Sequence, residues 1–139
     1  MTTRNATARL LLLLSLSMAA LAGSAGWVAA ATFDGSRPFL CAVATVMECD
    51  ASGQCERHLN DGGNALTFIR IDVPGQTITA GAKKTSVRQV LHVDGDLILQ
   101  GGENGRGWSA TIDEESGRMA AAVVDNDHTF SIFGGCTIP

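Results

Sequence analysis

The sequence predicts an all-β domain, a small antiparallel meander that closes into a barrel, preceded by an N-terminal signal peptide. The first observation is a series of short runs rich in Val, Ile and Thr, which turn residues separate at hairpin spacing. The second is that no stretch after residue 31 has the periodicity of an amphipathic helix. The third is a cysteine near each end of this part of the chain, able to join the first strand to the last. A sandwich is the alternative architecture.

Seven or eight segments are predicted to be strands, each ending at a turn signal. Phe39–Met47 is rich in Val and Thr, Pro74-Gly75 ends the second strand, and Asp94-Gly95 is typical of a two-residue hairpin turn. Cys49–Gly63 is predicted to be a polar loop, and Gly81–Lys84 a connection. The further strands are expected at Leu66–Val73, Thr77–Ala80, Ser86–Val93, Asp96–Gln100, Arg106–Ile112, Arg118–Val124 and Thr129–Phe133.

Apolar and polar residues alternate with a period of two in the second half of the chain. This alternation indicates strands with one buried face and one solvated face. The residues expected on the buried faces are Trp108, Ala110 and Ile112 in one strand, Met119, Ala121 and Val123 in the next, and Phe130 and Ile132 in the last.

Residues 1–31 have the three-part layout of a secretory signal peptide. Arg4 and Arg9 precede an unbroken leucine run, and small residues ending at Ala29-Ala30-Ala31 follow it. The strongly apolar core spans about 13 residues, fewer than the roughly 20 of a membrane-spanning helix, so we expect cleavage rather than anchoring. Residues 32–139 are therefore predicted to be one exported domain, periplasmic or secreted, without stable membrane insertion.

Charge excludes some partner classes. All 14 Asp and Glu but only eight of the ten Lys and Arg follow residue 31, so the remainder carries a net charge of −6. An acidic chain without a basic cluster argues against nucleic acid and against anionic membrane surfaces as main partners. A protein or a small ligand stays open as the partner, and the sequence does not indicate the oligomeric state.

Four cysteines follow the leader, and an even number in an exported chain indicates disulfides. Three pairings are possible. We favour Cys49–Cys55, which closes a short loop, and therefore Cys41–Cys136, which ties the first strand to the last. A zinc site formed by Cys49, Cys55 and His58 is the alternative.

No catalytic constellation stands out. His58, His92 and His128 remain after the leader, but the Gly-x-Ser-x-Gly element that often accompanies a catalytic serine is absent from the sequence. We therefore expect no catalytic residue among them.

Cofactor and metal motifs are equally weak. The glycine-rich run 102–107 has the wrong order for a phosphate loop, and we expect its glycines to permit positive φ in a hairpin loop. Asp125-x-Asp127-x-Thr129 lacks the later glycine and glutamate of an EF-hand, which leaves a weak surface calcium site as an alternative. The sequence predicts no cofactor and no metal.

Two polar segments are candidate recognition sites, because loops on a rigid β scaffold often carry binding residues. A stapled connector without a partner is the alternative for the first, and a place in the core is the alternative for the tryptophan of the second. The first segment contains Glu56, Arg57, His58, Asn60 and Asp61. The second contains Asn104, Arg106 and Trp108.

Three sets of segments, which together span most of the chain after the leader, resemble a family of small exported bacterial proteins with four cysteines. The resemblance implies a periplasmic or secreted location and no particular activity. The segments are Phe39–Cys41 with Glu48–Arg57, Leu97–Gly101 with Asn104–Ser109, and Gly117–Met119 with Phe133–Thr137.

The leading hypothesis is an exported, non-enzymatic β domain with a binding or structural role in the cell envelope. A small periplasmic hydrolase is one alternative. An inhibitor of a secreted enzyme is another, by loose analogy with the lysozyme inhibitors, which are also short disulfide-bearing β-barrels. The Ser-Gly-x-x-Tyr-type loop of those inhibitors is absent, since the chain contains no tyrosine.

Overall fold

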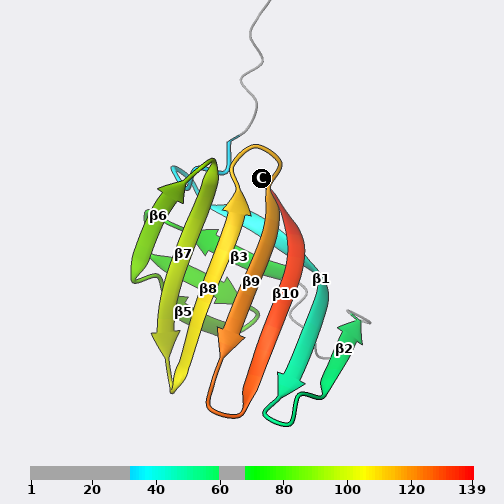
Figure 1. Ribbon diagram of the computed structural model, residues 1–139. Helices are drawn as coiled ribbons and strands as arrows, with labels where there is room; N and C mark the ends of the chain where they lie inside the picture. The colour runs from blue at the N-terminus through cyan, green and yellow to red at the C-terminus, as the bar shows by residue number, and fades with distance from the viewer. Residues whose placement is uncertain (1–31, 60–67) are drawn as a thin grey trace, which may run out of the picture.

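Ten strands and no helix make up the part of the chain that this computed structural model describes, residues 32–59 and 68–139 (Figure 1). Within these residues there is no helix of the length and apolarity that crossing a membrane requires. The strands are β1 (Phe39–Asp50), β2 (Cys55–Leu59), β3 (Phe68–Asp72), β4 (Thr77–Ala80), β5 (Lys83–Ser86), β6 (Gln89–Val93), β7 (Asp96–Glu103), β8 (Arg106–Asp113), β9 (Arg118–Val124) and β10 (His128–Thr137).

All ten strands belong to one antiparallel sheet that curls into a half-barrel. Its order is β5-β4-β3-β1-β10-β9-β8-β7-β6, and β2 pairs with β1 beside this path. Most strands pair with a neighbour in sequence, and the first and last strands, β1 and β10, pair with each other. The predicted all-β, barrel-like fold is confirmed.

The long strand β1 connects two layers of the half-barrel. In Figure 1, β6 to β10 run steeply across the front, whereas β3, β4 and β5 cross behind them. The first part of β1 pairs with β3 from Phe39 to Ala42, and its last part pairs with β2 from Thr45 to Cys49. The register against β10 shifts between Val43 and Thr45, so a bulge lies where the strand passes from one layer to the other.

The bulge decides which side chains of β1 face the inside. Before it, Phe39, Cys41 and Val43 are buried at alternate positions. After it, Val46 packs against the core instead, which is one position out of phase with the earlier residues. If β1 were regular here, with no bulge at Ala44, Val46 and then Glu48 would point to the convex face.

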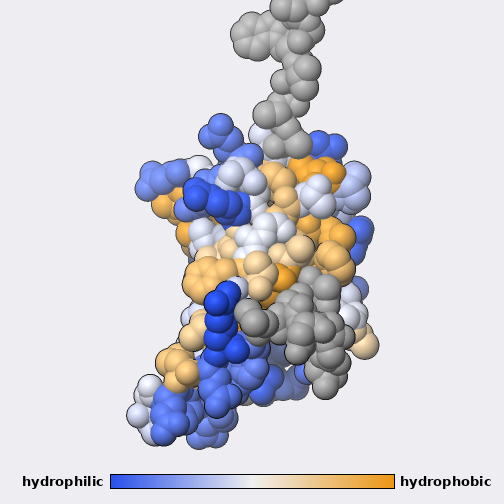
Figure 2. Space-filling view, turned by 90° about the vertical axis from the view of Figure 1, so that its right-hand side faces the viewer, coloured by the Kyte–Doolittle hydropathy of each residue, from blue (hydrophilic) through white to orange (hydrophobic). Residues whose placement is uncertain are grey.

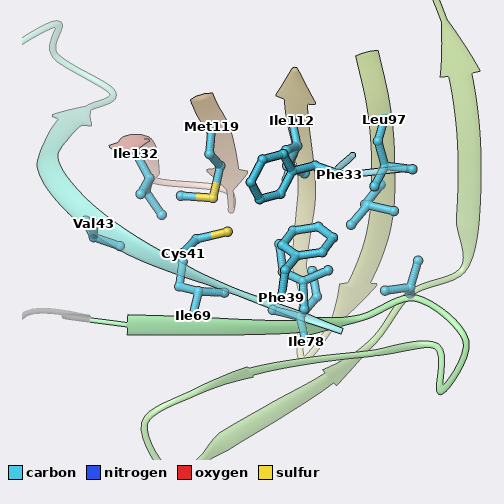
Figure 3. Close-up of a cluster of buried hydrophobic side chains, with 14 residues drawn as sticks. Phe33, Phe39, Cys41, Val43, Ile69, Ile78, Leu97, Ile112, Met119 and Ile132 are labelled. Atoms are coloured by element: carbon cyan, nitrogen blue, oxygen red, sulfur yellow. The ribbon is translucent and has the colours of Figure 1, made fainter. Parts of the chain in front are cut away.

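The core fills the upper part of the half-barrel, as Figure 1 is drawn, and Figure 3 shows side chains of both layers converging there. Leu97, Leu99 and Ile112 of the front layer have no exposed surface. Phe33 packs edge-on against Phe39 with ring centroids 5.7 Å apart, and its backbone N–H donates to the carbonyl of Glu114 at 2.8 Å. Phe33 therefore covers the upper end of the core.

Both predicted disulfides are present. Cys41 and Cys136 are direct register partners of β1 and β10, and their bond crosses the centre of the sheet. Cys49 and Cys55 join the last part of β1 to β2. The zinc site of Cys49, Cys55 and His58 is therefore wrong, because a disulfide takes up both sulfur atoms.

The strand prediction is wrong in two segments. Cys55–Leu59, expected within a polar loop, is strand β2, and Lys83–Ser86 forms strand β5 where the connection Gly81–Lys84 was expected to end. Both strands are short and rich in charged or polar residues, which is how proteins protect the edges of a sheet. Hydrogen bonds to β1 and β4 hold them, so neither strand needs the apolar alternation on which the prediction relied.

Tight turns set the spacing of the front strands. Asp94 and Gly95 have φ of 52° and 87°, and Asn104 and Gly105 have φ of 50° and 77°, as a two-residue hairpin turn requires. The Asp94-Gly95 turn is as predicted. In the run 102–107, only Gly105 among the glycines has positive φ, so the expectation for the other glycines is wrong.

Candidate functional site

A cavity of about 390 Å³ lies on the concave side of the half-barrel, towards the lower end in Figure 1. Its floor is the edge of the core, where Ile71, Ile78 and Met119 are buried. Small-molecule sites in proteins are concave, mostly apolar and about 300–1,000 Å³ in volume, so this cavity has the size and lining of such a site. The apolar wall comes from both layers and includes Val46, Ile69, Ala80, Trp108, Ala110, Ala121, Val123, Phe130 and Ile132.

Two small side chains create the space. Ala110 and Ala121 are register partners on β8 and β9, and they lie in one row between Leu99 of β7 and Ile132 of β10. Alanine at these two positions is shorter than its neighbours on either side. Because protein interiors are close-packed, larger residues here would fill the cavity.

Trp108 forms the wall beside β5. Its register partner on β7 is Gly101, where a Cβ atom would lie 2.3 Å from Trp108 Cζ2 and 2.6 Å from the Ser86 carbonyl oxygen. Glycine is needed at position 101 because the indole lies directly against the backbone. The Trp108 Nε1–H donates to Thr85 Oγ1 at 3.3 Å, so this side chain links the front layer to the back layer.

Charged residues surround the mouth of the cavity. Lys83 begins β5, Glu103 ends β7 and Arg106 begins β8, and all three line the cavity. Arg106 Nε donates to Asp125 Oδ2 at 3.2 Å. Its guanidinium Cζ lies 6.0 Å from the centroid of the Phe130 ring, within the range of a cation–π contact. Arg106 is therefore held at the edge of the apolar wall.

Asp125 is itself fixed by the turn between β9 and β10. Its Oδ1 accepts hydrogen bonds from the backbone N–H groups of Asp127 and His128 at 3.0 and 2.8 Å. These two bonds, with a smaller contribution from Arg106, lower the pKa of the Asp125 carboxyl below its usual range. A carboxylate at neutral pH thus orients Arg106. Both carboxylate oxygens of Asp125 already accept hydrogen bonds, Oδ1 from the backbone of the turn and Oδ2 from Arg106. This argues against the alternative of a calcium site at Asp125-x-Asp127-x-Thr129.

A further polar cluster continues from the mouth along the same face of the sheet. Glu48 lies 3.0 Å from His58 Nε2 and 3.9 Å from His128 Nε2, and His128 Nδ1 lies 3.7 Å from Asp125 Oδ1. Both histidine side chains are nearly half exposed, and neither lines the cavity. Figure 2, seen from the β2 side, shows that the lower end of the molecule is mostly hydrophilic, below a hydrophobic belt.

The structure places parts of both predicted recognition segments on this one concave face. His58 of the first segment is the register partner of Val46 in the cavity wall, and Arg106 and Trp108 of the second line the cavity. Glu56 faces Glu48 across the β1–β2 pair. Trp108 is half-buried, so it belongs to the edge of the core and to the cavity at once.

The remaining predicted residues lie elsewhere. Arg57 is on the opposite face of β2, where its Nη2 donates to Thr45 Oγ1 at 3.3 Å. Asn104 is exposed in the β7–β8 turn and does not line the cavity. Asn60 and Asp61 lie outside the described residues. In its described part the first segment is strand β2 and not a loop, because Glu56, Arg57 and His58 lie on that strand. A recognition role of these residues stays a prediction.

Sequence reasoning missed several residues of the site. The sequence patterns do not point to Lys83 or Glu48 as binding residues, and they connect Asp125 only with a weak calcium site. Their convergence depends on the pairing of β1 with β10 and of β10 with β9, which no local pattern reveals. The alternation of Ala110 with Ser109 and Thr111 did indicate an inward face, and the small size of Ala110 and Ala121 was the available signal for a cavity.

His92 lies apart from this site. Its Nδ1 contacts Glu114 Oε1, near the covered end of the half-barrel. It does not line the cavity.

The chain was compared with family models, curated proteins and solved structures, and none of them matches.

Proposed function

We propose that this protein is an exported binding protein that holds a small apolar molecule in the half-barrel cavity. The observation that carries the proposal is the inward face at the lower end, where apolar side chains from both layers surround about 390 Å³ of space. Burial of apolar surface would supply most of the affinity, at roughly 25 cal/mol per Å² removed from water. The resemblance to exported four-cysteine proteins remains a prediction.

Two features support export. Residues 1–31 have the layout of a signal peptide, and two disulfides are compatible with an oxidising compartment such as the periplasm or the cell exterior. We expect the protein recovered from the cell envelope to begin at residue 26, 31 or 32, which mass spectrometry of the N-terminal peptide would determine. An intact N-terminus with membrane retention would contradict cleavage.

A binding role fits the cavity better than a hydrolase does. A hydrolase of the serine type needs a hydroxyl within reach of a base. The hydroxyl residues of the lining are Thr85 and Ser109, and Thr85 accepts the hydrogen bond of Trp108. In the described part of the chain, no histidine lines the cavity.

Tryptophan fluorescence tests the proposal directly. A Trp27→Phe background leaves Trp108, in the cavity wall, as the only tryptophan of the chain. Titration with decanol, a neutral chain, should shift the Trp108 emission to shorter wavelength and saturate, because the alcohol displaces water beside the indole. If Trp108 emission shows no saturable change while the cavity residues are unaltered, the proposal is overturned.

Matched variants locate the site. Ala121→Phe places a ring in the cavity and should weaken decanol binding at least about tenfold, that is by 1.4 kcal/mol or more. Ala120→Phe, on the neighbouring exposed position of β9, should leave the affinity unchanged. Val123→Phe, nearer the mouth, provides a second blocked variant if Ala121→Phe does not fold by circular dichroism. Equal affinity in all three variants would place binding outside the cavity.

A further inference from the structure

We infer that the ligand is a single-chain amphiphile with a carboxylate head, whose chain lies in the cavity and whose head meets Arg106 and Lys83 at the mouth. This inference rests on the proposed function and specifies its ligand class. It combines the apolar wall, the positions of two cations and the donor geometry of Arg106.

The residues that line the cavity are net positive, although the chain as a whole is acidic. The chain has a formal net charge of −4, yet the cavity lining contains two basic residues, Lys83 and Arg106, and one acid, Glu103. Lys83 comes from the back layer and Arg106 from the front layer, so cations lie on both sides of the opening. This arrangement favours an anionic group between the two layers.

Arg106 is prepared for an anion. Asp125 engages its Nε atom alone, and Phe130 lies beside the guanidinium plane. Within the described residues neither of its Nη groups donates a hydrogen bond, and the side chain is about half exposed. An arginine held in this way presents Nη donors that match a carboxylate.

The size of the cavity argues for a single chain. Its volume of about 390 Å³ lies near the lower limit for small-molecule sites, about 300 Å³. The apolar floor at Ile71 and Ile78 continues to the charged mouth, so a chain with one polar end satisfies both regions. A cationic head would be repelled by Lys83 and Arg106, and a wholly neutral chain would leave the free Nη donors of Arg106 without an acceptor.

Three ligands with the same alkyl chain and different head groups distinguish the contribution of the head from that of the tail. Decanoate, decanol and decyltrimethylammonium are titrated at neutral pH into the Trp27→Phe protein, below the micelle-forming concentration of the two ionic ligands and below the solubility limit of decanol. We expect decanoate to bind at least about tenfold more tightly than decanol, and the cation to bind most weakly. High salt should reduce the preference for decanoate, because the cations at the mouth are partly exposed.

Variants assign the preference to named residues. Arg106→Gln and Lys83→Gln should each lower the ratio of decanoate to decanol affinity, and together they should bring it close to one. Lys84→Gln and Arg118→Gln are matched controls, since neither residue lines the cavity, and they should keep the wild-type ratio.

The outcomes distinguish the two proposals. Saturable binding of all three ligands with equal affinity, or a preference for the cation, would overturn the carboxylate inference and leave the binding function standing. No saturable binding of any chain would overturn both. An unchanged ratio in the double variant Arg106→Gln/Lys83→Gln would show that the head lies elsewhere.

Discussion

The two ends of the half-barrel are built from the same strands, yet one is filled with side chains and the other contains a cavity. At the upper end, Leu97 and Ile112 have no exposed surface, and Phe33 covers them from outside the sheet. At the lower end, Ala110 and Ala121 occupy equivalent inward positions and leave space. The alternation of the strands is the same at both ends, so the sizes of the inward residues decide where the molecule is stable and where it can bind.

The charges follow the same division. No polar or charged residue is buried among the described residues, and the upper core is apolar throughout. The lower end carries Arg106, Asp125, Glu48 and two histidines on the inward face, next to the cavity. Polar groups that would destabilise a filled core are tolerated there because the face is open to water.

The largest expected effect on stability comes from the disulfide that passes through the filled region. The double variant Cys41→Ala/Cys136→Ala should lower the free energy of unfolding by about 4–5 kcal/mol, because this bond closes a loop with a sequence separation of 95. The variant Cys49→Ala/Cys55→Ala, with a separation of 6, should lose only about 2 kcal/mol. Guanidinium unfolding measures both losses, and equal losses would contradict the account.

Truncation of inward residues should cost more at the filled end. Ile112→Ala removes atoms from a side chain with no exposed surface and should destabilise the protein by about 2–5 kcal/mol. Val123→Ala, in the cavity wall, should cost less than about 1 kcal/mol, because its side chain is already partly in contact with solvent. A Val123→Ala loss as large as that of Ile112→Ala would mean that the cavity is packed in solution.

Two glycines of the β7–β8 hairpin, Gly101 and Gly107, allow a further comparison between a packed position and an open one. Gly101→Ala would press on Trp108 and on the Ser86 carbonyl, so we expect a loss of about 1–3 kcal/mol and an altered Trp108 emission spectrum. Gly107→Ala would bring its Cβ only to within 3.7 Å of Val124 Cγ2, and the stability should change by about 0.5 kcal/mol or less. The reverse order of the two effects would contradict the position of the indole.

The smallest expected effect is a dependence of stability on pH. The pKa of Asp125 is lowered in the folded protein, whereas an unfolded Asp titrates near about 3.9. The carboxylate therefore contributes stability above about pH 4, and this contribution is lost as the pH falls through the folded pKa. Urea unfolding at pH 6 and pH 3 should show a smaller decrease for Asp125→Asn than for the wild type. Identical decreases would exclude this role.

Local patterns predicted most of the fold. Arg118–Val124 and Thr77–Ala80 are predicted with the bounds that the structure shows, because flanking turn residues delimit both strands. The pairing of Cys41 with Cys136 also followed from the sequence, since a short second loop left few alternatives. Cys55–Leu59 could not be predicted, because its stability comes from pairing with β1 and not from its own residues.

The candidate site could be predicted only in pieces. Arg106, Trp108 and His58 belonged to two separate predicted segments. Their common face depends on the bulge in β1, which brings Val46 and Glu48 inward, and on the pairing of β1 with β10. Both are contacts between residues far apart in sequence, so the residue types were visible beforehand but their arrangement was not.

The most direct test of the account is a map of amide chemical shifts in the ¹H–¹⁵N spectrum of the protein, recorded during titration with decanol. The account predicts that the largest shifts belong to residues around the cavity, in β5, β8, β9 and the start of β10, with small shifts at Phe33 and at the Asp94-Gly95 turn. Shifts concentrated on the convex face around Ala120 and Phe133, or no saturable shift at all, would contradict it.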